Sequence, residues 1–396
     1  MIGESIISRH GQPALMTYPV SIVRVKDPTN DNEIKRAIST SIDLVGGLSS
    51  IIEKGDRVVL KPNLEAPRDS KTAATTSMVF IERLVELTRQ VGAEPIVAEG
   101  PFMNYDSRAV FKITGVEELC RRLGVDLVDL NDTETVEVHV PGGKAHKRLR
   151  IPKVVMDADK LVNIPKMKTH HLTTLTCAMK NLKGVLPGKD KQLSHVRGLH
   201  QAIVDISKVV HSDLVVVDGI TAMEGMGPTF GNVVPLGVVV AGTNEVAVDT
   251  VCARIMGIKP NDVEHLKIAF NDFSIKAEDV ETVGTPLQDV RTSLEIPHEG
   301  TMYTLAQRCA HLLDRYFYQT FRPGKSLFPL LSGLFGAHPR IDASKCTACG
   351  LCVKSCPVDA IDLPAKRIKA SKCVDCLICS ELCPLQAVYI KGVALN

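Results

Sequence analysis

Short, unbroken apolar runs alternate with stretches of helical periodicity over residues 1–300. The runs that we expect to be strands are 20–27, 56–63, 94–100, 158–166, 213–220 and 236–242. The stretches that we expect to be helices are 32–45, 77–91, 198–210 and 245–256. Because the strands are apolar throughout instead of alternating with polar residues, they indicate a mostly parallel sheet covered by helices on both faces.

The end of the chain has a different pattern, which suggests how the domains are organised. A helix is expected at 304–321, followed by a linker rich in Pro and Gly at 322–339. We therefore predict a large α/β domain over 1–300, a helix and linker over 301–339, and a small α+β, ferredoxin-like domain over 340–396.

Two cysteine runs in the small domain share the spacing C-x2-C-x2-C-x3-C-P. This is the run of two-cluster bacterial ferredoxins, in which the fourth cysteine of each run ligates the other cluster. The ligands that we assign to one [4Fe–4S] cluster are Cys346, Cys349, Cys352 and Cys383. The ligands that we assign to the second cluster are Cys356, Cys373, Cys376 and Cys379.

Zinc is the alternative metal for clustered cysteines in a reducing compartment. Zinc takes four ligands in two pairs, however, and does not need two interlocked quartets. The remaining cysteines are scattered along the chain and are expected to be dispensable for metal binding: Cys120, Cys177, Cys252 and Cys309.

Composition excludes several partners. The 47 Lys and Arg against 45 Asp and Glu give a net charge of +2, which provides no overall attraction to nucleic acid or to an anionic membrane. With aromatic residues at 4% and no Trp, a stacking surface for single-stranded nucleic acid is not expected. No apolar run approaches the roughly 18 residues of a membrane span, and we see no signal peptide. We therefore expect a cytoplasmic protein with neither nucleic acid nor membrane as partner.

A stretch at 165–195 holds six lysines and three histidines against one acid, Asp190. We expect strand 158–166 to lead into a loop, then a helix at about 172–183 that stops at a left-handed Gly184. Lys180 and Lys183 lie one helical step apart and would share a face.

This basic stretch has two interpretations. As a solvated basic face it would need no ligand. Because it is so depleted of acids, we favour an anion site, in which a strand-end loop supplies N–H groups and lysines supply charge. The candidate anion-binding lysines are Lys166, Lys168, Lys180 and Lys183. The candidate proton donors are His170, His171 and His195, because an unperturbed imidazole titrates at about pH 6.5.

A Gly-rich segment at 218–231 follows another expected strand, where ligands bind in open α/β sheets. Gly225 and Gly227 would let the backbone approach a ligand closely. Glu224 is either an acid of the site or only a turn residue. The segment fits neither the Walker loop nor the G-x-G-x-x-G fingerprint, so it names no nucleotide.

Several motifs together carry a family resemblance: "LKPN", "NIPKMKTH", "MKNLKGVLPG", "VDGITAMEGMGP" and "EVAVDTVCARIMG". In this order they resemble a prokaryotic family known only as domain of unknown function 362, often fused to a two-cluster ferredoxin module. The resemblance covers about residues 20–285 and the tail. It implies an iron–sulfur protein of anaerobic-type metabolism, with no general reaction assigned.

Residues 157–188 are also similar in rhythm to the lactate racemase family, which holds a nickel-pincer nucleotide. On that resemblance His171 would match a catalytic histidine and Lys180 a cofactor-binding lysine. The other histidines of that family have no match here. The resemblance implies a phosphorylated or nucleotide-like organic ligand over the basic stretch.

Three functions follow from these features. The leading hypothesis is a ferredoxin-linked reductase, in which an electron donor or acceptor protein exchanges electrons with the clusters and an anionic small molecule occupies the basic pocket. The first alternative is a non-catalytic electron-transfer subunit whose large domain docks a partner redox enzyme. The second alternative is an enzyme whose clusters are only structural.

Overall fold

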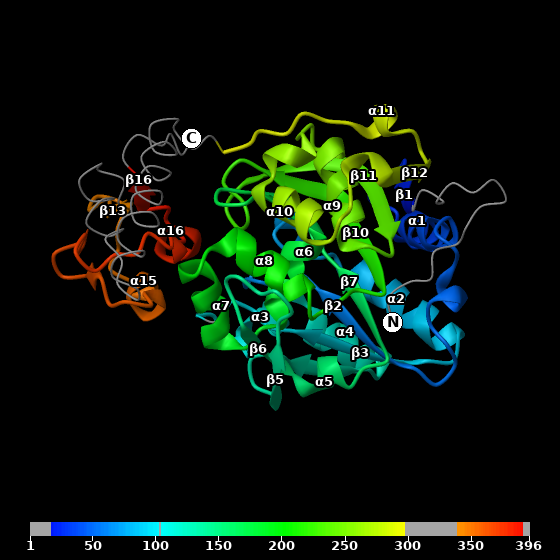
Figure 1. Ribbon diagram of the computed structural model, residues 1–396, viewed down its shortest axis with the longest axis horizontal. Coiled ribbons are helices and arrows are strands. Elements are labelled where there is room, and N and C mark those ends of the chain that lie inside the picture. Colours follow the sequence, from blue (N-terminus) through cyan, green and yellow to red (C-terminus); the bar gives the residue numbers. More distant parts are fainter. Residues whose placement is uncertain (1–16, 103, 298–338, 391–396) are drawn as a thin grey trace.

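The computed structural model describes residues 17–102, 104–297 and 339–390 (Figure 1). The expected helix at 304–321, nearly all of the expected linker, and Cys309 lie outside the described residues. Within the described ranges, no helix is long and apolar enough to cross a membrane.

A ten-stranded sheet forms the centre of the large domain, and its main path has the order β12-β1-β11-β10-β7-β2-β3-β4. Its strands are β1 (Tyr18–Arg24), β2 (Arg57–Pro62), β3 (Glu94–Glu99), β4 (Asp126–Asp129), β7 (Lys160–Ile164), β8 (Lys166–His170), β9 (Thr174–Thr176), β10 (Leu214–Glu224), β11 (Asn232–Gly242) and β12 (Val280–Gly284). Along the main path, only the pairings of β11 with β1 and β10 are antiparallel. The mostly parallel α/β fold expected from the sequence is therefore confirmed.

Helices cover both faces of this sheet (Figure 1). One face packs against α1 (Asp31–Asp43), α2 (Met78–Gln90), α3 (Ser107–Thr114) and α4 (Val116–Leu123). The other packs against α6 (Ala178–Asn181), α8 (Leu199–Ser207), α9 (Glu245–Ile255) and α10 (Glu264–Asp272). Neighbouring residues of β10 point to opposite faces, so Val215 and Val216 join different core clusters although both are fully buried. This two-sided burial is why the strand is an unbroken apolar run.

The remaining elements of the large domain flank the sheet. They are β5 (Thr135–His139), β6 (Arg148–Pro152), α5 (Lys153–Met156), α7 (Gly188–Val196) and α11 (Leu287–Val290). Strands β5 and β6 form a separate antiparallel hairpin. Helix α7 lies beside the small C-terminal module, and the Gln192 side chain donates to the Ser355 carbonyl at 3.4 Å (Figure 1).

The C-terminal module contains short helices and strands, as expected for an α+β ferredoxin-like domain. Its elements are β13 (Pro339–Ile341), α15 (Leu351–Ser355), β14 (Ile361–Asp362), β15 (Arg367–Ile368), α16 (Ile378–Leu382) and β16 (Val388–Ile390). Strand β13 pairs with β16, and β14 pairs with β15, both antiparallel.

The basic stretch folds differently from the sequence expectation. The segment expected to be a loop is strand β8, and the expected helix at 172–183 is wrong because its first part forms strand β9. Helix α6 is followed by a 3-10 turn, Leu182–Val185. Gly184 does not have the left-handed conformation expected of a helix stop. Instead, a Cβ there would lie 2.6 Å from Glu99 Oε1 and 2.7 Å from Lys61 Nζ, so only glycine fits.

Candidate functional site

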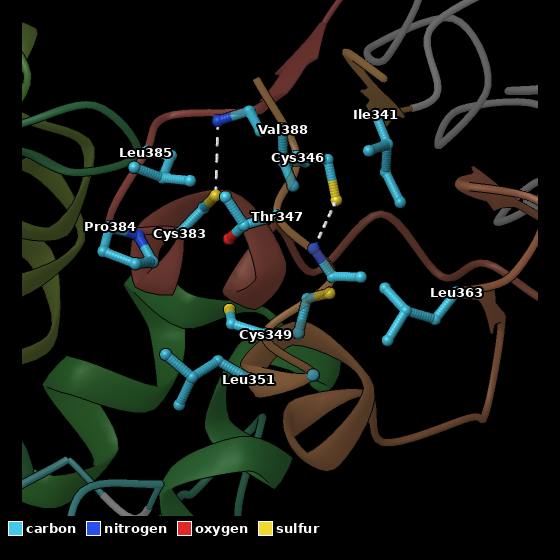
Figure 2. A pocket seen from close by; sticks show the side chains of 14 residues that line it. Ile341, Cys346, Thr347, Cys349, Leu351, Leu363, Cys383, Pro384, Leu385 and Val388 are labelled. Carbon is cyan, nitrogen blue, oxygen red and sulfur yellow. Dashed lines mark hydrogen bonds between the residues drawn. The ribbon is translucent and has the colours of Figure 1, made fainter. Parts of the chain in front are cut away.

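Four cysteines of the C-terminal module line one cavity (Figure 2). They come from both cysteine runs: Cys346, Cys349, Cys352 and Cys383. The first three lie at the start of α15, whereas Cys383 follows α16 and reaches the same cavity from the second run. This is the grouping in which the fourth cysteine of one run joins the other run's cluster.

The second quartet lies deeper in the module. Cys379 is buried, and burial raises its pKa well above the ordinary value. The nearby thiols that raise its pKa further are Cys376, Cys373, Cys352 and Cys356. Buried thiols of this kind ionise only when a positively charged metal compensates them, so this donor set fits an iron–sulfur cluster.

The two cysteine runs have the same backbone conformation. Equivalent residues have positive φ angles in each run: Ala348 and Asp375, Gly350 and Leu377, and Asp359 and Gln386. The amides of Ala360 and Ala387 each donate to the fourth cysteine of their run, to Cys356 Sγ and Cys383 Sγ, at 3.2 Å. Amide hydrogen bonds to cysteine sulfur are one of the means by which proteins set the potential of an iron–sulfur cluster.

The large domain has a pocket at the carboxyl ends of its parallel strands. Its lining residues include Asn63 after β2, Phe102 after β3, Thr176 of β9, and Lys180 of α6. Ligands in open α/β folds bind at this edge of the sheet, because loops that are distant in sequence meet there. The structure therefore brings part of the basic stretch to a place where it can face a ligand.

Two lysines of the basic stretch already have carboxylate partners from distant strand ends. Lys166 Nζ lies 2.9 Å from Asp218 Oδ1, and both side chains are buried. Lys168 Nζ lies 3.0 Å from Glu65 Oε1 and also donates to Asn63 Oδ1 at 2.8 Å. These two charges are neutralised within the protein, so they hold the pocket walls together and leave no free charge for a ligand.

Lys180 differs from these two lysines. Its side chain is 7% exposed and lines the pocket, and among the described residues no carboxylate lies within ion-pair distance of it. Its charge contributes to lowering the pKa of His170, after burial. Lys180 is therefore the lysine of this stretch that remains available to an anionic ligand.

Lys183 forms a close pair with a histidine. Its Nζ lies 2.6 Å from His195 Nε2 and 5.3 Å from the centroid of the Phe102 ring, in cation–π geometry. Burial lowers the pKa of Lys183 to about 7; Glu381 opposes this shift and Lys180 adds to it. Burial also lowers the pKa of His195 well below its ordinary value, so the imidazole is neutral and accepts from Lys183.

His170 and His171 are stacked, with ring centroids 5.0 Å apart. His170 Nδ1 accepts from the Leu172 amide at 2.9 Å, which places its hydrogen on Nε2. Burial lowers the pKa of both imidazoles. His170 Nε2 has no hydrogen-bond partner among the described residues, so it is a buried donor facing the site.

His171 is held by the Gly-rich segment. Its Nδ1 lies 3.0 Å from the Gly227 carbonyl, so Nδ1 donates and Nε2 carries the lone pair. A Cβ on Gly227 would lie 2.0 Å from the Thr169 carbonyl oxygen, so this glycine allows the Gly-rich segment to pack on β8. Gly225 has a left-handed φ of 68°, and its amide donates to the Glu295 carbonyl at 2.7 Å. The two glycines therefore serve contacts within the protein.

Glu224 is not brought together with the histidines. Its Oε2 accepts from the Glu295 amide at 2.9 Å, and it is not among the residues that line the pocket. The structure thus places His170, His195, Lys180 and Lys183 around one site, and places Glu224 elsewhere.

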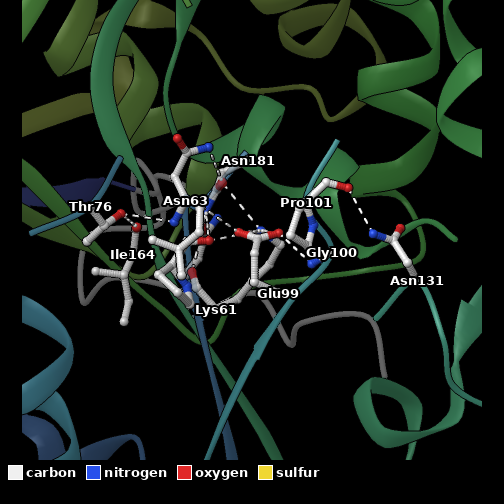
Figure 3. Close-up of polar contacts among 12 residues, drawn as sticks. Lys61, Asn63, Thr76, Glu99, Gly100, Pro101, Asn131, Ile164 and Asn181 are labelled. Atoms are coloured by element: carbon white, nitrogen blue, oxygen red, sulfur yellow. Dashed lines mark hydrogen bonds and ion pairs between the residues drawn. The ribbon is translucent and has the colours of Figure 1, made fainter. Parts of the chain in front are cut away.

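Several site residues were not singled out from the sequence. A buried network centres on Lys61 Nζ, which lies 3.0 Å from Glu99 Oε2 and 3.3 Å from Asn181 Oδ1 (Figure 3). Lys191, whose pKa burial lowers to about 7, donates to the Gly100 carbonyl at 2.6 Å. The motifs "LKPN" and "AEGP" at two strand ends were the available signal for this network.

The most unexpected site residue comes from the C-terminal module. Glu381 of α16 lines the large-domain pocket, with Oε1 at 3.6 Å from His170 Nε2 and Oε2 at 4.0 Å from His195 Nε2. Burial opposes its ionisation, but His170, Lys180 and His195 hold its pKa well below the ordinary value. Within the described ranges, no group of three or more His, Cys, Asp or Glu side chains is arranged to hold a single metal ion.

The depressed pKa of Lys183 leads to a pH prediction. The lysine is charged below about pH 7 and neutral above it, so binding of a small anion should weaken as the pH rises through that value. Sulfate is a suitable probe because it stays fully ionised over this range. Equilibrium dialysis of radiolabelled sulfate across this pH range should show the step in the wild type and not in Lys183→Met.

Lys191 provides the matched control for this experiment. Its pKa is also lowered to about 7, but its Nζ is held by the Gly100 and Pro101 carbonyls and by Asn131 Oδ1. Lys191 also lines the pocket, but because its Nζ already donates to these three oxygens, Lys191→Met should keep most of the pH step. If the step survives in Lys183→Met and disappears in Lys191→Met, the lysine that titrates is Lys191, and the prediction for Lys183 is wrong.

The cysteine centre beside the sheet-edge pocket defines the class of this protein. It is an iron–sulfur protein whose C-terminal module is of the kind that transfers electrons. Residues 58–254 match the family described as a domain of unknown function (DUF362), and residues 339–362 match the 4Fe-4S binding domain. The chain thus combines a DUF362 domain with a 4Fe–4S domain, which confirms the resemblance carried by its motifs.

Two known proteins are similar to this chain. A thylakoid-associated protein of Synechocystis sp. is 29% identical over 251 residues, which are 62% of this chain and 76% of that protein. The lactate racemase apoprotein from Thermoanaerobacterium thermosaccharolyticum matches with a TM-score of 0.40 and 11% identity over 62% of this chain. The chain spans 59% of the length of that racemase structure, which comes from the second family that the sequence resembled.

Proposed function

We propose that the protein is a ferredoxin-linked reductase that passes electrons from its iron–sulfur centre to an anionic acceptor in the large-domain pocket. The observation that best supports this proposal is the position of α16. This helix contains Cys379 and is followed by Cys383, and its Glu381 lines the pocket beside Lys180 and Lys183. Ligand cysteines of the centre and lining residues of the pocket are therefore neighbours on one short helix.

The two cysteine quartets differ in their exposure to solvent, and this difference suggests the path that electrons would take between them. Cys349 of the first quartet is exposed, whereas Cys379 of the second is buried in α16, the helix that also carries Glu381. An electron donor or acceptor protein would meet the first cluster, and the second would face the pocket. Binding of two [4Fe–4S] clusters is part of this proposal, as is a cytoplasmic location, where reduced thiols persist.

The pocket residues have separate tasks in such a reaction. Lys180 holds negative charge on the acceptor, and Lys183 adds a second positive charge below about pH 7. The Nε2–H of His170 is a buried donor without a hydrogen-bond partner among the described residues, so it can donate a hydrogen bond to an acceptor atom that gains negative charge on reduction. The clusters supply the electrons, and the protein supplies position, charge and hydrogen bonds.

A non-catalytic electron-transfer subunit is the second candidate, and one observation favours it. Leu385 and Tyr389 are exposed apolar residues of the C-terminal module, at 43% and 38%, and Leu385 lines the cavity of the first quartet. A partner redox enzyme could dock there. This candidate gives no task to the pocket, which is what separates it from the reductase.

Lys180→Met tests the reductase proposal. Removing one charged contact should weaken binding of the anionic acceptor by about 1.5–3 kcal/mol, or roughly 10- to 150-fold. The melting temperature should not fall, because Lys180 has no carboxylate partner that the change would leave unpaired. The measurement compares small molecules released on denaturing anaerobically purified wild type and variant, by mass spectrometry.

The released compound is then returned to protein whose clusters have been reduced, and their visible absorbance is followed. Re-oxidation should be fast in the wild type and slow in Lys180→Met at the same concentration. Lys189→Met is the matched control, because Lys189 belongs to the same basic stretch but is exposed. If no compound is released, or if the compound re-oxidises both proteins equally, the reductase proposal is wrong.

A further inference from the structure

Glu381 occupies the position in the pocket where an anionic ligand would bind. It belongs to the C-terminal module, yet its carboxylate lies between two imidazoles of the large domain, with one oxygen toward each. The module is also held there by apolar contacts, because Ile378 and Leu382 of α16 pack on Phe102. The carboxylate is thus delivered into the pocket by a docked helix.

The contacts of this carboxylate are loose. Its distances of 3.6 Å to His170 Nε2 and 4.0 Å to His195 Nε2 exceed those of a normal hydrogen bond, about 2.7–3.2 Å. Glu381 Oε2 and His170 Nε2 are both buried without a hydrogen-bond partner among the described residues. Buried polar groups in proteins are nearly always hydrogen-bonded, so these atoms indicate a site that is complete only with another occupant.

The charges of the pocket favour a carboxylate as that occupant. Glu65 and Glu99 also line the pocket, each in an ion pair with a buried lysine. Their charges are cancelled by these lysines, so above about pH 7 the pocket offers an occupant the charge of Lys180, which matches a singly charged group. A planar, singly charged group matches the arrangement that Glu381 already shows, with one oxygen facing the His170 Nε2–H donor and the other beside the pair of Lys183 and His195.

We propose that Glu381 is a stand-in for the carboxylate of an organic acid, and that this acid displaces it when it binds. The inference rests on the proposed function, because it names the class of the electron acceptor: a small organic acid. Thr176 Oγ1, also buried without a partner among the described residues, lies at the same pocket and can bind a second polar group of the acid.

Because Glu381 belongs to the C-terminal module, its displacement couples binding of the acid to the position of that module. A tethered carboxylate competes with a free one at a high effective concentration, so it weakens the apparent affinity for the acid. Because Glu381 lies between Cys379 and Cys383, its movement adjusts the helix that carries cluster ligands.

Glu381→Gln tests this inference, because glutamine keeps the shape and removes the charge. Oxalate is the probe for a planar carboxylate and sulfate the probe for a tetrahedral anion of the same total charge, both measured by calorimetry on the oxidised, full-length protein. We expect the affinity for oxalate to rise about tenfold, a change of about 1.4 kcal/mol. The affinity for sulfate should change far less.

Leu382→Ala is the matched control, because it weakens the packing of α16 on Phe102 and keeps the carboxylate. It should raise the oxalate affinity less than the Glu381 variants do, because the carboxylate still competes for the pocket. Glu381→Ala is a second variant with the same expected gain, and the iron content of each protein shows whether the centre is intact. Unchanged or weaker oxalate binding in both Glu381 variants would overturn the inference, as would an equal gain in Leu382→Ala or for sulfate.

Failure of this inference can be told from failure of the reductase proposal. Oxalate binding is measured without electron flow, so a tenfold gain in the Glu381 variants supports the stand-in even if no acceptor re-oxidises the clusters. Conversely, an acceptor that re-oxidises the clusters but is a phosphate ester without a carboxylate keeps the reductase and overturns the stand-in.

Discussion

Replacing Cys346 with serine is expected to remove about half of the iron from the anaerobically prepared protein. Two [4Fe–4S] clusters correspond to about eight iron and eight acid-labile sulfide per chain, and loss of one ligand should cost one cluster, about four of each. Because Cys383 lines the same cavity as Cys346, Cys383→Ser should have the same effect. Iron and sulfide assays and the electron paramagnetic resonance of the reduced protein measure it.

The pattern across variants tests the interlocked assignment. Cys356→Ser should behave like Cys373→Ser and remove the other cluster, although Cys356 belongs to the first run. A double variant with one change in each quartet should contain almost no iron and should pass no electrons. Cys120→Ala is the control, since Cys120 is buried in the core cluster of α2 and α4, and it should keep all of the iron.

Two outcomes would contradict this prediction. If Cys356→Ser resembles Cys346→Ser, each run holds its own cluster and the crossing of the fourth cysteine is wrong. If anaerobic reconstitution yields a stable protein with zinc and no iron, the site is a zinc site.

Most of the sheet could be predicted because its strands are buried on both faces. Residues 213–220 were recognised as a strand since each face of β10 packs in a core, which requires an unbroken apolar run. Strand β8 could not be recognised in the same way. Its Lys166 and Lys168 are buried only because Asp218 and Glu65 pair with them, and those acids are far away in the sequence.

The positive charge of the candidate site could be predicted from the sequence, but the residues that its lysines contact could not. The excess of bases at 165–195 predicted an anion site, whereas the structure supplies acids from distant parts of the chain to two of its lysines, Lys166 and Lys168. Local sequence cannot say which lysines are left without an acid. The structure shows that, among the described residues, no carboxylate lies within ion-pair distance of the three lysines that line the pocket, which are Lys180, Lys183 and Lys191. Lys180 and Lys183 are both buried, whereas they would be exposed if they lay on a solvated helix.

One signal for Glu381 was present in the sequence. The two cysteine runs are equivalent, and the residue two positions after the third cysteine is Lys354 in the first run and Glu381 in the second. Lys354 is exposed, as a charged residue on a small helix usually is, whereas Glu381 is 7% exposed. A comparison of the two halves of the repeat shows that this position differs in charge between them. It does not show which residues Glu381 contacts.

The buried pair of Lys61 and Glu99 leads to the largest expected effect on stability. Their side chains are 0% and 2% exposed, and Glu99 also accepts from the amides of Leu64 and Gly100 (Figure 3). Burial lowers the pKa of Lys61, and Glu99 opposes this shift. Neither charge can be hydrated in this position, so each depends on the other.

Lys61→Met should therefore destabilise the large domain by about 3–5 kcal/mol, because it leaves the Glu99 carboxylate buried without a cation. The double variant Lys61→Met with Glu99→Gln should recover part of this loss, since the neutral amide oxygen still accepts from a backbone amide. Lys35→Met is the matched control: Lys35 pairs with Glu82 and Glu86 at a side-chain exposure of 23%, and such a pair is worth at most about 1 kcal/mol.

Thermal unfolding followed by circular dichroism, under anaerobic conditions and at pH values on both sides of neutrality, measures all three variants. The single variant should melt far below the control, because it leaves a buried carboxylate without its cation. A deficit in Lys61→Met that is no larger than that of Lys35→Met at every pH would show that water reaches Glu99, and that the pair does not hold the strand ends of the pocket together.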